Sequence, residues 1–267
     1  MQHHPGAPRA IQERFELKYV VPESQARAIS AFARCYCDPD PHLEAGCDDY
    51  VLTTLYLDSP ELNLYWDKKT LRYDRLKLRV RGYGRRAEGL VFVELKRRYG
   101  DVVSKTRTLV PRDRWAGLVE EPTTFDRSAW AGDGGDVVED FCLQCVRYRA
   151  RPVIVLRYDR EPLMGRFDPE IRVTFDRGIR FCRTGSLELP AGEDRYLPLV
   201  FNAGVWTEEP LVVLELKFTW SFPRWMQDLV ERFDLDRASF SKYSRALDQA
   251  MWEPLDCDPA GFRSVLG

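Results

Sequence analysis

The chain has 267 residues, of which 44% are hydrophobic and 31% are charged, and its formal net charge at pH 7 is −2. This composition supplies enough apolar side chains for a sizeable core, and the charged fraction is above the usual quarter. With 40 basic and 42 acidic side chains, the chain lacks the overall positive charge of a protein that binds duplex nucleic acid. We therefore expect no duplex partner, and any anion site must be a local concentration of lysine and arginine.

The sequence shows no run of about eighteen apolar residues, the length needed for a membrane-spanning helix, and its start lacks the apolar middle of a signal peptide. We expect a cytoplasmic protein with no membrane segment in this chain, and we make no prediction of its oligomeric state. Its seven cysteines are an odd number, which fits reduced thiols better than a disulfide framework. The pairs Cys35/Cys37 and Cys142/Cys145 are closely spaced, but the rest of a zinc pattern is missing, so buried structural cysteine is the favoured interpretation.

In chain order, the first predicted unit is a strand followed by a helix. Residues 13–21 read as a strand, and residues 22–36 place Ile29, Phe32, Ala33 and Tyr36 on one helical face. Four further strands are predicted at 50–58, 75–84, 90–98 and 102–110, with the Gly-containing segment 84–89 as a hairpin connection. This stretch indicates an antiparallel meander.

The second half begins with helical segments within residues 111–150, around a glycine cluster at 132–135 that we predict to be a mobile surface loop. Strands resume at 151–163 and 170–181, a loop follows at 189–198, and the last strong strand is predicted at 211–218. Residues 221–236 place Met226, Leu229, Val230 and Phe233 at helical spacing. Because strands run through the whole chain with helices between them, one large antiparallel sheet or barrel is more economical than two domains.

The tripeptide ELK occurs three times beside strand-forming residues, at 16–18, 94–96 and 215–217. Residues two apart on a strand share a face, so Glu and Lys lie on one side and aliphatic residues on the other. A solvated sheet face would explain any single strand, but such faces favour cross-strand pairs of opposite charge. Here the faces are dominated by cations, because other predicted strands add Lys77, Arg79 and Arg81, Lys105 and Arg107, Tyr158 and Arg160, and Arg172, Thr174 and Asp176.

A sheet that closes into a barrel would place these charges in its interior. Desolvated like charges are unfavourable unless they are paired, and a polyanion with a divalent metal would neutralise them. Arginine forks and lysine ammonium groups match phosphate oxygens, and glutamates nearby can hold Mg²⁺ or Mn²⁺ that bridges those oxygens. The pattern therefore predicts a metal-triphosphate site.

Seven segments in order, FELKY, RLKLRVRGYG, VFVELKRR, VLRYDR, IRVTFD, VVLELKF and SFSKYSRA, resemble the VTC (polyphosphate polymerase) domain of the triphosphate tunnel metalloenzyme superfamily, which includes the CYTH-type triphosphatases. The resemblance implies an α+β fold, a closed antiparallel β-barrel of about eight strands that forms the triphosphate tunnel, with helices packed outside. It implies a flexible N-terminus at residues 1–12, a single tunnel domain at 13–250 and a C-terminal tail at 251–267.

The resemblance, together with the charged strand faces, also implies roles for individual residues. The expected catalytic residues are Lys18, Arg79, Arg81, Arg160, Arg172 and Lys242. Further substrate contacts are expected from Lys77, Lys96, Lys105, Arg107, Tyr158, Lys217 and Ser241. Glu215 matches the family's metal-binding glutamate, and Glu94 and Glu16 are the next candidate metal ligands. The first strand reads ELK where the triphosphatases have ExExK, which favours the VTC branch.

In that branch, the implied reaction is transfer of the γ-phosphoryl group of ATP onto a growing polyphosphate chain, with Mn²⁺ or Mg²⁺ as cofactor. The expected ligands are ATP, inorganic polyphosphate, pyrophosphate or triphosphate. Two alternatives stay open, a tripolyphosphatase or nucleoside triphosphatase in which water is the acceptor, and a polyphosphate-binding module without turnover. Glu215 could also be only a salt-bridge partner of a lysine such as Lys217 or Lys242.

Overall fold

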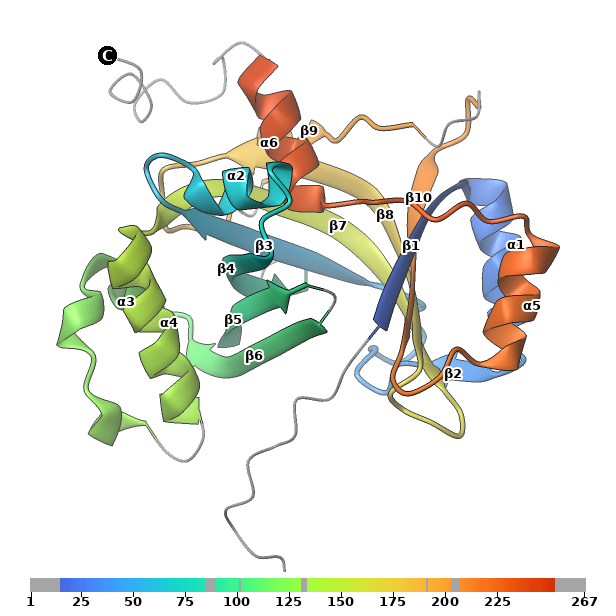
Figure 1. Ribbon diagram of the computed structural model, residues 1–267, viewed down its shortest axis with the longest axis horizontal. Coiled ribbons are helices and arrows are strands. Elements are labelled where there is room, and N and C mark those ends of the chain that lie inside the picture. Colours follow the sequence, from blue (N-terminus) through green and yellow to red (C-terminus); the bar gives the residue numbers. More distant parts are fainter. Residues whose placement is uncertain are drawn as a thin grey trace, which may run out of the picture.

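The computed structural model describes residues 15–84, 90–100, 102–130, 134–190, 192–202 and 207–252. Its main element is one curled antiparallel sheet (Figure 1). The strands lie in the order β1 (Phe15–Pro22), β10 (Leu211–Phe218), β8 (Arg172–Arg183), β7 (Arg151–Gly165), β3 (Tyr50–Asp58), β4 (Asp74–Tyr83), β5 (Leu90–Tyr99) and β6 (Val102–Pro111). Two short strands complete it, β2 (Cys37–Pro39) beside β7 and β9 (Leu197–Pro198) beside β8.

The sheet is open, so the prediction of a closed barrel is wrong, whereas the α+β class and the antiparallel, curled sheet with helices are confirmed. β1 and β6 are the two edges, and within the described residues no backbone pairing joins them. Side chains cross the opening instead, since Lys96 on β5 donates to Glu16 on β1 at 2.8 Å. We attribute the open edge to charge, because pairing β1 with β6 would press further cations into a desolvated interior.

Helices cover the convex face of the sheet where the strand alternation leaves it aliphatic. The helices α1 (Glu23–Ala33) and α5 (Arg224–Arg232) pack on β1 and β10 (Figure 1). The helices α3 (Gly117–Glu120) and α4 (Gly134–Tyr148) cover β4, β5 and β6 through residues that include Leu78, Val93 and Phe141, all 0% exposed. Short 3₁₀ turns lie at Pro122–Thr124, Arg127–Ala129 and Glu193–Arg195.

The helices α2 (Asn63–Lys69) and α6 (Lys242–Trp252) lie elsewhere, across one end of the sheet (Figure 1). α6 packs on concave-side residues such as Leu52, Leu156 and Tyr158. This arrangement departs from the expectation that all helices lie outside the tunnel. Its cause is a patch of apolar side chains on the concave side of β3 and β7, which needs a covering element. None of the described helices is both long enough and apolar enough to cross a bilayer.

Several predicted boundaries shift. α1 ends at Ala33, and Tyr36 lies beyond it with its ring stacked on Trp225 at 4.9 Å. Gly134 and Gly135 begin α4 and are not part of a loop, while residues 131–133 and the hairpin residues 85–89 lie outside the described part. The same is true of the predicted flexible N-terminus and of the tail from residue 253 onward, and Met251 and Trp252 belong to α6.

Asp58 at the end of β3 joins the two helices at this end of the sheet. Its side chain is fully buried and accepts from the backbone N–H groups of Ser59 (2.7 Å), Leu64 and Tyr65 (both 2.9 Å). It also accepts from the hydroxyl of Tyr243 in the first turn of α6. One carboxylate therefore holds the start of α2 and the start of α6, next to Lys242.

We predict that Asp58→Ala lowers the free energy of unfolding by about 3 kcal/mol, because it leaves several buried donors without an acceptor. Urea denaturation followed by circular dichroism measures this. The matched control is Lys69→Ala, which removes an exposed ion pair to Asp248 on the same two helices and should cost less than about 1 kcal/mol. Equal small losses in both variants would contradict the role given to Asp58.

Candidate functional site

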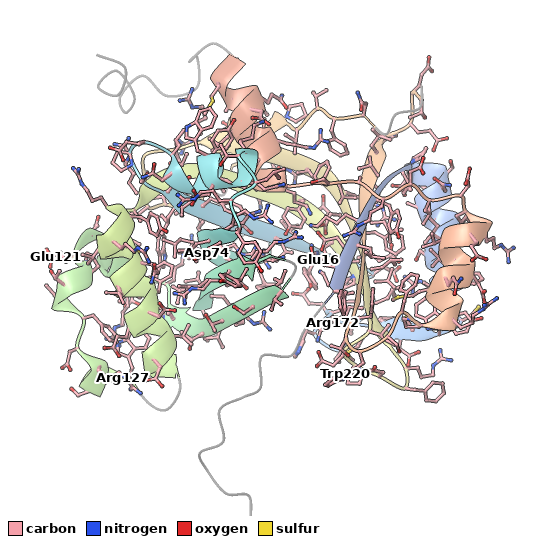
Figure 2. All side chains as sticks on the ribbon, viewed as in Figure 1. Glu16, Asp74, Glu121, Arg127, Arg172 and Trp220 are labelled. Atoms are coloured by element: carbon pink, nitrogen blue, oxygen red, sulfur yellow. The ribbon has the colours of Figure 1, made fainter. Side chains whose placement is uncertain are left out.

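The predicted site residues lie on the concave side of the sheet, where strands far apart in the sequence face one another. Figure 2 shows Glu16 of β1 at the opening toward β4 to β6. Strand register aligns the charges in rows, so that Lys77 faces Lys96 and Arg79 faces Glu94 across β4 and β5. We call this set of residues the concave site. Its members are Glu16, Lys18, Lys77, Arg79, Arg81, Glu94, Lys96, Lys105, Arg107, Tyr158, Arg160, Arg172, Asp176, Glu215, Lys217, Ser241 and Lys242.

Glu215 is the centre of one charge cluster. Its carboxylate lies 2.7 Å from the Nζ atoms of both Lys18 and Lys217, and 3.4 Å from that of Lys242. Arg160 contributes a fourth cation at 3.6 Å. Burial alone would raise the pKa of Glu215, but these cations outweigh it and hold the pKa well below its usual range. The carboxylate is therefore ionised and shared among four cations.

Glu16 extends this cluster across the opening of the sheet. It lies 2.8 Å from the Nζ atoms of both Lys18 and Lys96. Lys18 consequently bridges Glu16 and Glu215, and its pKa is raised despite its burial because both carboxylates stabilise the ammonium form. An entering anion could take over Lys18 without leaving either glutamate unpaired, since each keeps another lysine.

Asp176 on β8 is a member of the cluster that the sequence analysis placed on the charged face but did not name as a site residue. It is 0% exposed and accepts two hydrogen bonds from Arg160, at 2.6 and 2.7 Å. It is also paired with Lys242. The signal that could have identified it is its spacing on the same strand face as Arg172 and Thr174. This bidentate pair fixes the Arg160 guanidinium within the site.

Glu94 forms a second, separate cluster on β4 to β6. It is 0% exposed and lies 2.6 Å from Arg79, 3.0 Å from Lys105, 3.7 Å from Arg81 and 4.0 Å from Arg107. Burial opposes its ionisation, but the cations hold its pKa below the ordinary value. Burial lowers the pKa of Lys105 to about 6, and the neighbouring cations Arg81 and Arg79 act in the same direction. Glu94 raises this pKa and so offsets only part of the shift.

Other predicted residues line the space around the two clusters. The Tyr158 ring lies beneath Arg160 (5.4 Å) and Lys242 (5.0 Å) in cation-π contacts. Arg172 is more exposed and lies 3.7 Å from Asp40. The buried hydroxyl of Thr174 is without a hydrogen-bond partner among the described residues. The hydroxyl groups of Tyr56 and Thr54 also belong to this surface, since they accept hydrogen bonds from Arg79 (3.4 Å) and Arg81 (3.2 Å), respectively. They were not predicted, because an uncharged strand residue carries no charge pattern that would identify it.

The carboxylates of the concave site do not by themselves form a complete set of ligands for a divalent cation. The described residues contain no group of three or more His, Cys, Asp or Glu arranged to hold a metal ion. Mg²⁺ is, however, commonly bound by one or two carboxylates together with substrate phosphates. Glu215 fits that mode with Glu16 or Asp176, because each shares a cation with it. Glu94 is the least suited of the predicted metal ligands, because among the described residues the four cations paired with it are not shared with a second carboxylate.

The six cysteines that the structure describes lie apart from the concave site. Cys35 and Cys47 are exposed, and Cys37, Cys142, Cys145 and Cys182 are buried. Cys142 and Cys145 are part of the apolar core beneath α4. Burial raises the pKa of Cys142 to about 11, which is unfavourable for the thiolate that a metal requires.

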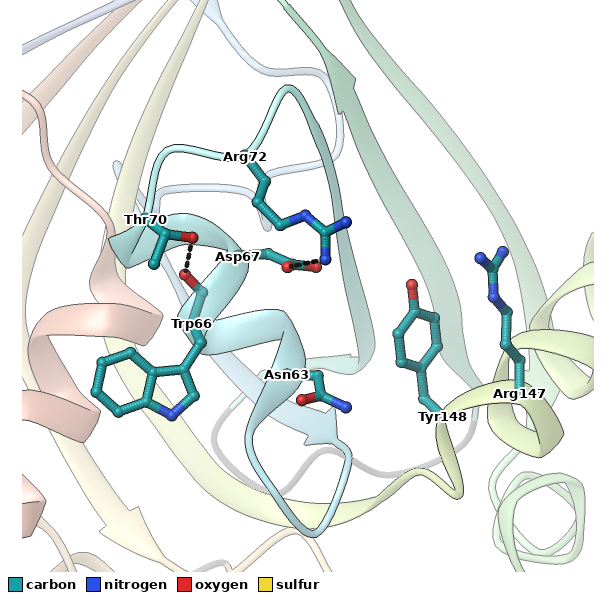
Figure 3. Close-up of a pocket in the computed structure, with 7 residues that line it drawn as sticks. All are labelled: Asn63, Trp66, Asp67, Thr70, Arg72, Arg147 and Tyr148. Atoms are coloured by element: carbon teal, nitrogen blue, oxygen red, sulfur yellow. Dashed lines mark hydrogen bonds and ion pairs between the residues drawn. The ribbon is translucent and has the colours of Figure 1, made fainter.

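A cavity of about 510 Å³ also lies away from the concave site, between α2 and the end of α4 (Figure 3). Its lining residues are Asn63, Trp66, Asp67, Thr70, Arg72, Arg147 and Tyr148. Arg72 pairs with Asp67 at 3.2 Å, and the Thr70 hydroxyl donates to the Trp66 carbonyl at 2.8 Å. No predicted site residue lines this cavity, so it does not belong to the proposed phosphate site.

We predict that Glu94→Gln lowers the free energy of unfolding by about 3–5 kcal/mol, because several buried cations lose their shared counter-ion. Thermal unfolding measures the loss, and added tripolyphosphate should recover part of it by supplying the missing negative charge. Glu231→Gln on the exposed face of α5 is the matched control and should change little. If both variants unfold at the wild-type temperature, Glu94 is not the counter-ion of this cluster.

Acid should destabilise the protein through the same carboxylates. Glu16, Glu94, Asp176 and Glu215 all have lowered pKa values in the folded state. Their contribution to the free energy of unfolding is fully present above pH 4.5, the ordinary pKa of glutamate. It is lost as the pH falls toward the lowered pKa values of the folded state. We predict a steep fall in the free energy of unfolding below that pH, measured by urea titrations, and a shallower fall in Glu94→Gln. A pH-independent difference between the two proteins would contradict this.

Comparisons with known proteins place the chain in a family. The model of the VTC domain matches residues 13–251, and a search of curated proteins gives no match. Among solved structures, 18 chains match. One is a Bacillus halodurans protein described as a candidate adenylate cyclase, with 13% identity and a TM-score of 0.48, over 86% of this chain and 94% of that one. The family match covers nearly the whole chain, and the protein is therefore a member of the VTC-domain family, whose enzymes bind triphosphates and polyphosphates.

Proposed function

We propose that the concave site transfers the γ-phosphoryl group of ATP to an inorganic polyphosphate chain in a metal-dependent reaction. The observation that carries the proposal is the excess of cations over carboxylates on one concave surface. The cations are Lys18, Lys77, Arg79, Arg81, Lys96, Lys105, Arg107, Arg160, Arg172, Lys217 and Lys242, and the carboxylates that pair with them are Glu16, Asp40, Glu94, Asp176 and Glu215. A chain of phosphates has the charge and the length to neutralise this excess.

Phosphoryl transfer depends mainly on positioning the reactants and neutralising charge on the transferred group. Arg160 is suited to positioning, because Asp176 fixes its guanidinium through two hydrogen bonds. Lys18 and Lys242 are suited to neutralising charge, since both lie next to Glu215 and keep a carboxylate partner on the other side. Arg79 and Arg81, held by Glu94, form the opposing wall of the site.

A divalent cation bound with the phosphates would withdraw charge from their oxygens as a Lewis acid. Glu215 is the residue proposed to hold it, with Glu16 or Asp176 as the second carboxylate. Lys18, Lys217 and Lys242 pair with Glu215 in the structure. With an ion held by Glu215, these lysines would be available to donate to the phosphate oxygens.

The reaction type is tested by incubating the protein with ATP and Mn²⁺ and then separating long polyphosphate from free phosphate. A polymerase lengthens the chains and releases ADP, with little free phosphate. A hydrolase releases free phosphate instead. Binding of tripolyphosphate with neither product identifies a binding module and would overturn the proposed transfer activity.

We predict that Glu215→Gln lowers phosphoryl transfer by roughly a hundredfold or more, as expected when a major electrostatic contributor is lost. Tripolyphosphate binding should be retained or tightened, because one negative charge near the polyanion is gone. Turnover measured over a range of Mn²⁺ concentrations and calorimetric binding together separate the two effects. The variant should also unfold at a lower temperature when empty, since Glu215 compensates several buried cations.

The control for this variant is again Glu231→Gln, which removes a glutamate charge outside the site. It should keep wild-type turnover and metal dependence. If Glu215→Gln folds normally and turns over ATP with the wild-type dependence on Mn²⁺, Glu215 is only a salt-bridge partner and the metal is held elsewhere.

A further inference from the structure

Strand register places three lysines of the concave site side by side. Lys77 on β4 is directly opposite Lys96 on β5, which is directly opposite Lys105 on β6. Like charges in such positions destabilise a sheet. Two members of this row are compensated, because Lys96 pairs with Glu16 at 2.8 Å and Lys105 with Glu94 at 3.0 Å.

Lys77 differs from every other lysine of the concave site. Among the described residues, its Nζ has no carboxylate within ion-pair distance and instead donates to the hydroxyl of Ser241 at 3.1 Å. The other lysines each have at least one carboxylate partner within 4.0 Å, namely Lys18, Lys96, Lys105, Lys217 and Lys242. The Lys77 amine therefore lacks a direct counter-charge.

The charged groups that face Lys77 come from three strands and are mostly positive. Those with the largest influence on it are the cations Lys96 of β5, Lys18 of β1 and Arg79 of β4, followed by the carboxylate Glu16 of β1. Glu16 is already shared by Lys18 and Lys96. Burial, followed by the three cations, holds the pKa of Lys77 well below its ordinary value of 10.5. Both effects favour the neutral amine while no anion is bound.

We propose that Lys77 and Ser241 form a proton-coupled phosphate subsite, in which the neutral Lys77 amine takes up a proton from solvent when a phosphate group binds beside it. The amine lone pair forms the new N–H bond, and the resulting ammonium donates to a phosphate oxygen. Ser241 can then turn its hydroxyl proton to the same phosphate. The inference rests on the proposed function, since it requires that phosphate chains enter the concave site.

Proton uptake on binding has a defined sign. An anion beside Lys77 favours the ammonium form, so the bound state holds more protons than the empty state at neutral pH. Affinity for the phosphate chain should therefore fall as the pH rises. Without a bound anion, the same residue lowers the stability of the fold, because folded Lys77 binds its proton more weakly than unfolded Lys77 does. Lys77→Met should then be at least as stable as the wild type, which makes it a suitable variant for testing binding.

We test the subsite by calorimetry of tripolyphosphate binding at neutral pH, in HEPES and in Tris. The observed enthalpy changes with the ionisation enthalpy of the buffer in proportion to the number of protons taken up. Wild-type protein should take up more protons on binding than Lys77→Met does. Protons exchanged by the ligand itself cancel in this comparison, because the ligand is the same.

Two further variants separate proton coupling from charge alone. Lys77→Arg retains a permanent cation, so it should bind tripolyphosphate with the reduced proton uptake of Lys77→Met. Arg172→Met removes a more exposed cation that does not titrate, so it should weaken binding and keep the wild-type uptake. Equal proton uptake in wild type, Lys77→Met and Lys77→Arg, with binding intact, would overturn the subsite and leave the proposed function standing. Failure of the wild type to bind tripolyphosphate would overturn both.

Discussion

Repulsion among cations on the concave face is the constraint on which the rest of this structure depends. Each carboxylate there serves several cations, as Glu94 does for Arg79, Arg81 and Lys105. Charges removed from water are costly unless they are compensated, and the carboxylates that pair with these cations are too few to match them. The open edge between β1 and β6 follows from the same constraint, since it leaves water access where a closed barrel would not.

The convex face supplies the stability that the concave face lacks. Along β4, β5 and β10 the side chains alternate, and the aliphatic members are buried beneath α1, α4 and α5. At one end, α6 crosses to the concave side and brings Lys242, together with Ser241 directly before it in the chain, into the site. Asp58 holds the first turn of this helix through Tyr243, whose ring stacks on Tyr56 at 4.8 Å. The buried polar groups Asp58 and Tyr243 therefore connect the packing of α6 with the position of Lys242 in the concave site.

Strand alternation allowed much of this arrangement to be predicted from the sequence. The period of two in RLKLRVRG and LVVLELKF identifies the strands and separates a charged face from an aliphatic one. It does not determine which strands pair, because edge pairing depends on curvature and on charge across the opening. That is why a closed barrel was expected and an open sheet was found.

The sequence also could not predict which charged side chains of the site form ion pairs with one another. The three ELK tripeptides are identical in sequence, yet their glutamates have different partners in the structure. Glu94 pairs with cations of its own cluster such as Arg79, whereas Glu16 and Glu215 share Lys18. Asp176 carries the same strand spacing as its neighbours, but its bond to Arg160 comes from the pairing of β7 with β8. At Gly134 and Gly135 the prediction was wrong, because the glycine-rich composition indicated a loop. In the structure these residues begin α4, which packs against β6.

The central claim is that the concave site is electrostatically incomplete without a phosphate chain. Thermal unfolding with increasing tripolyphosphate tests it most directly, because a ligand that binds only the folded state raises the unfolding temperature. We predict a rise that grows with ligand concentration and shrinks with added salt, since salt screens the partly exposed charges of the site. An unfolding temperature that stays unchanged at millimolar tripolyphosphate would contradict the account.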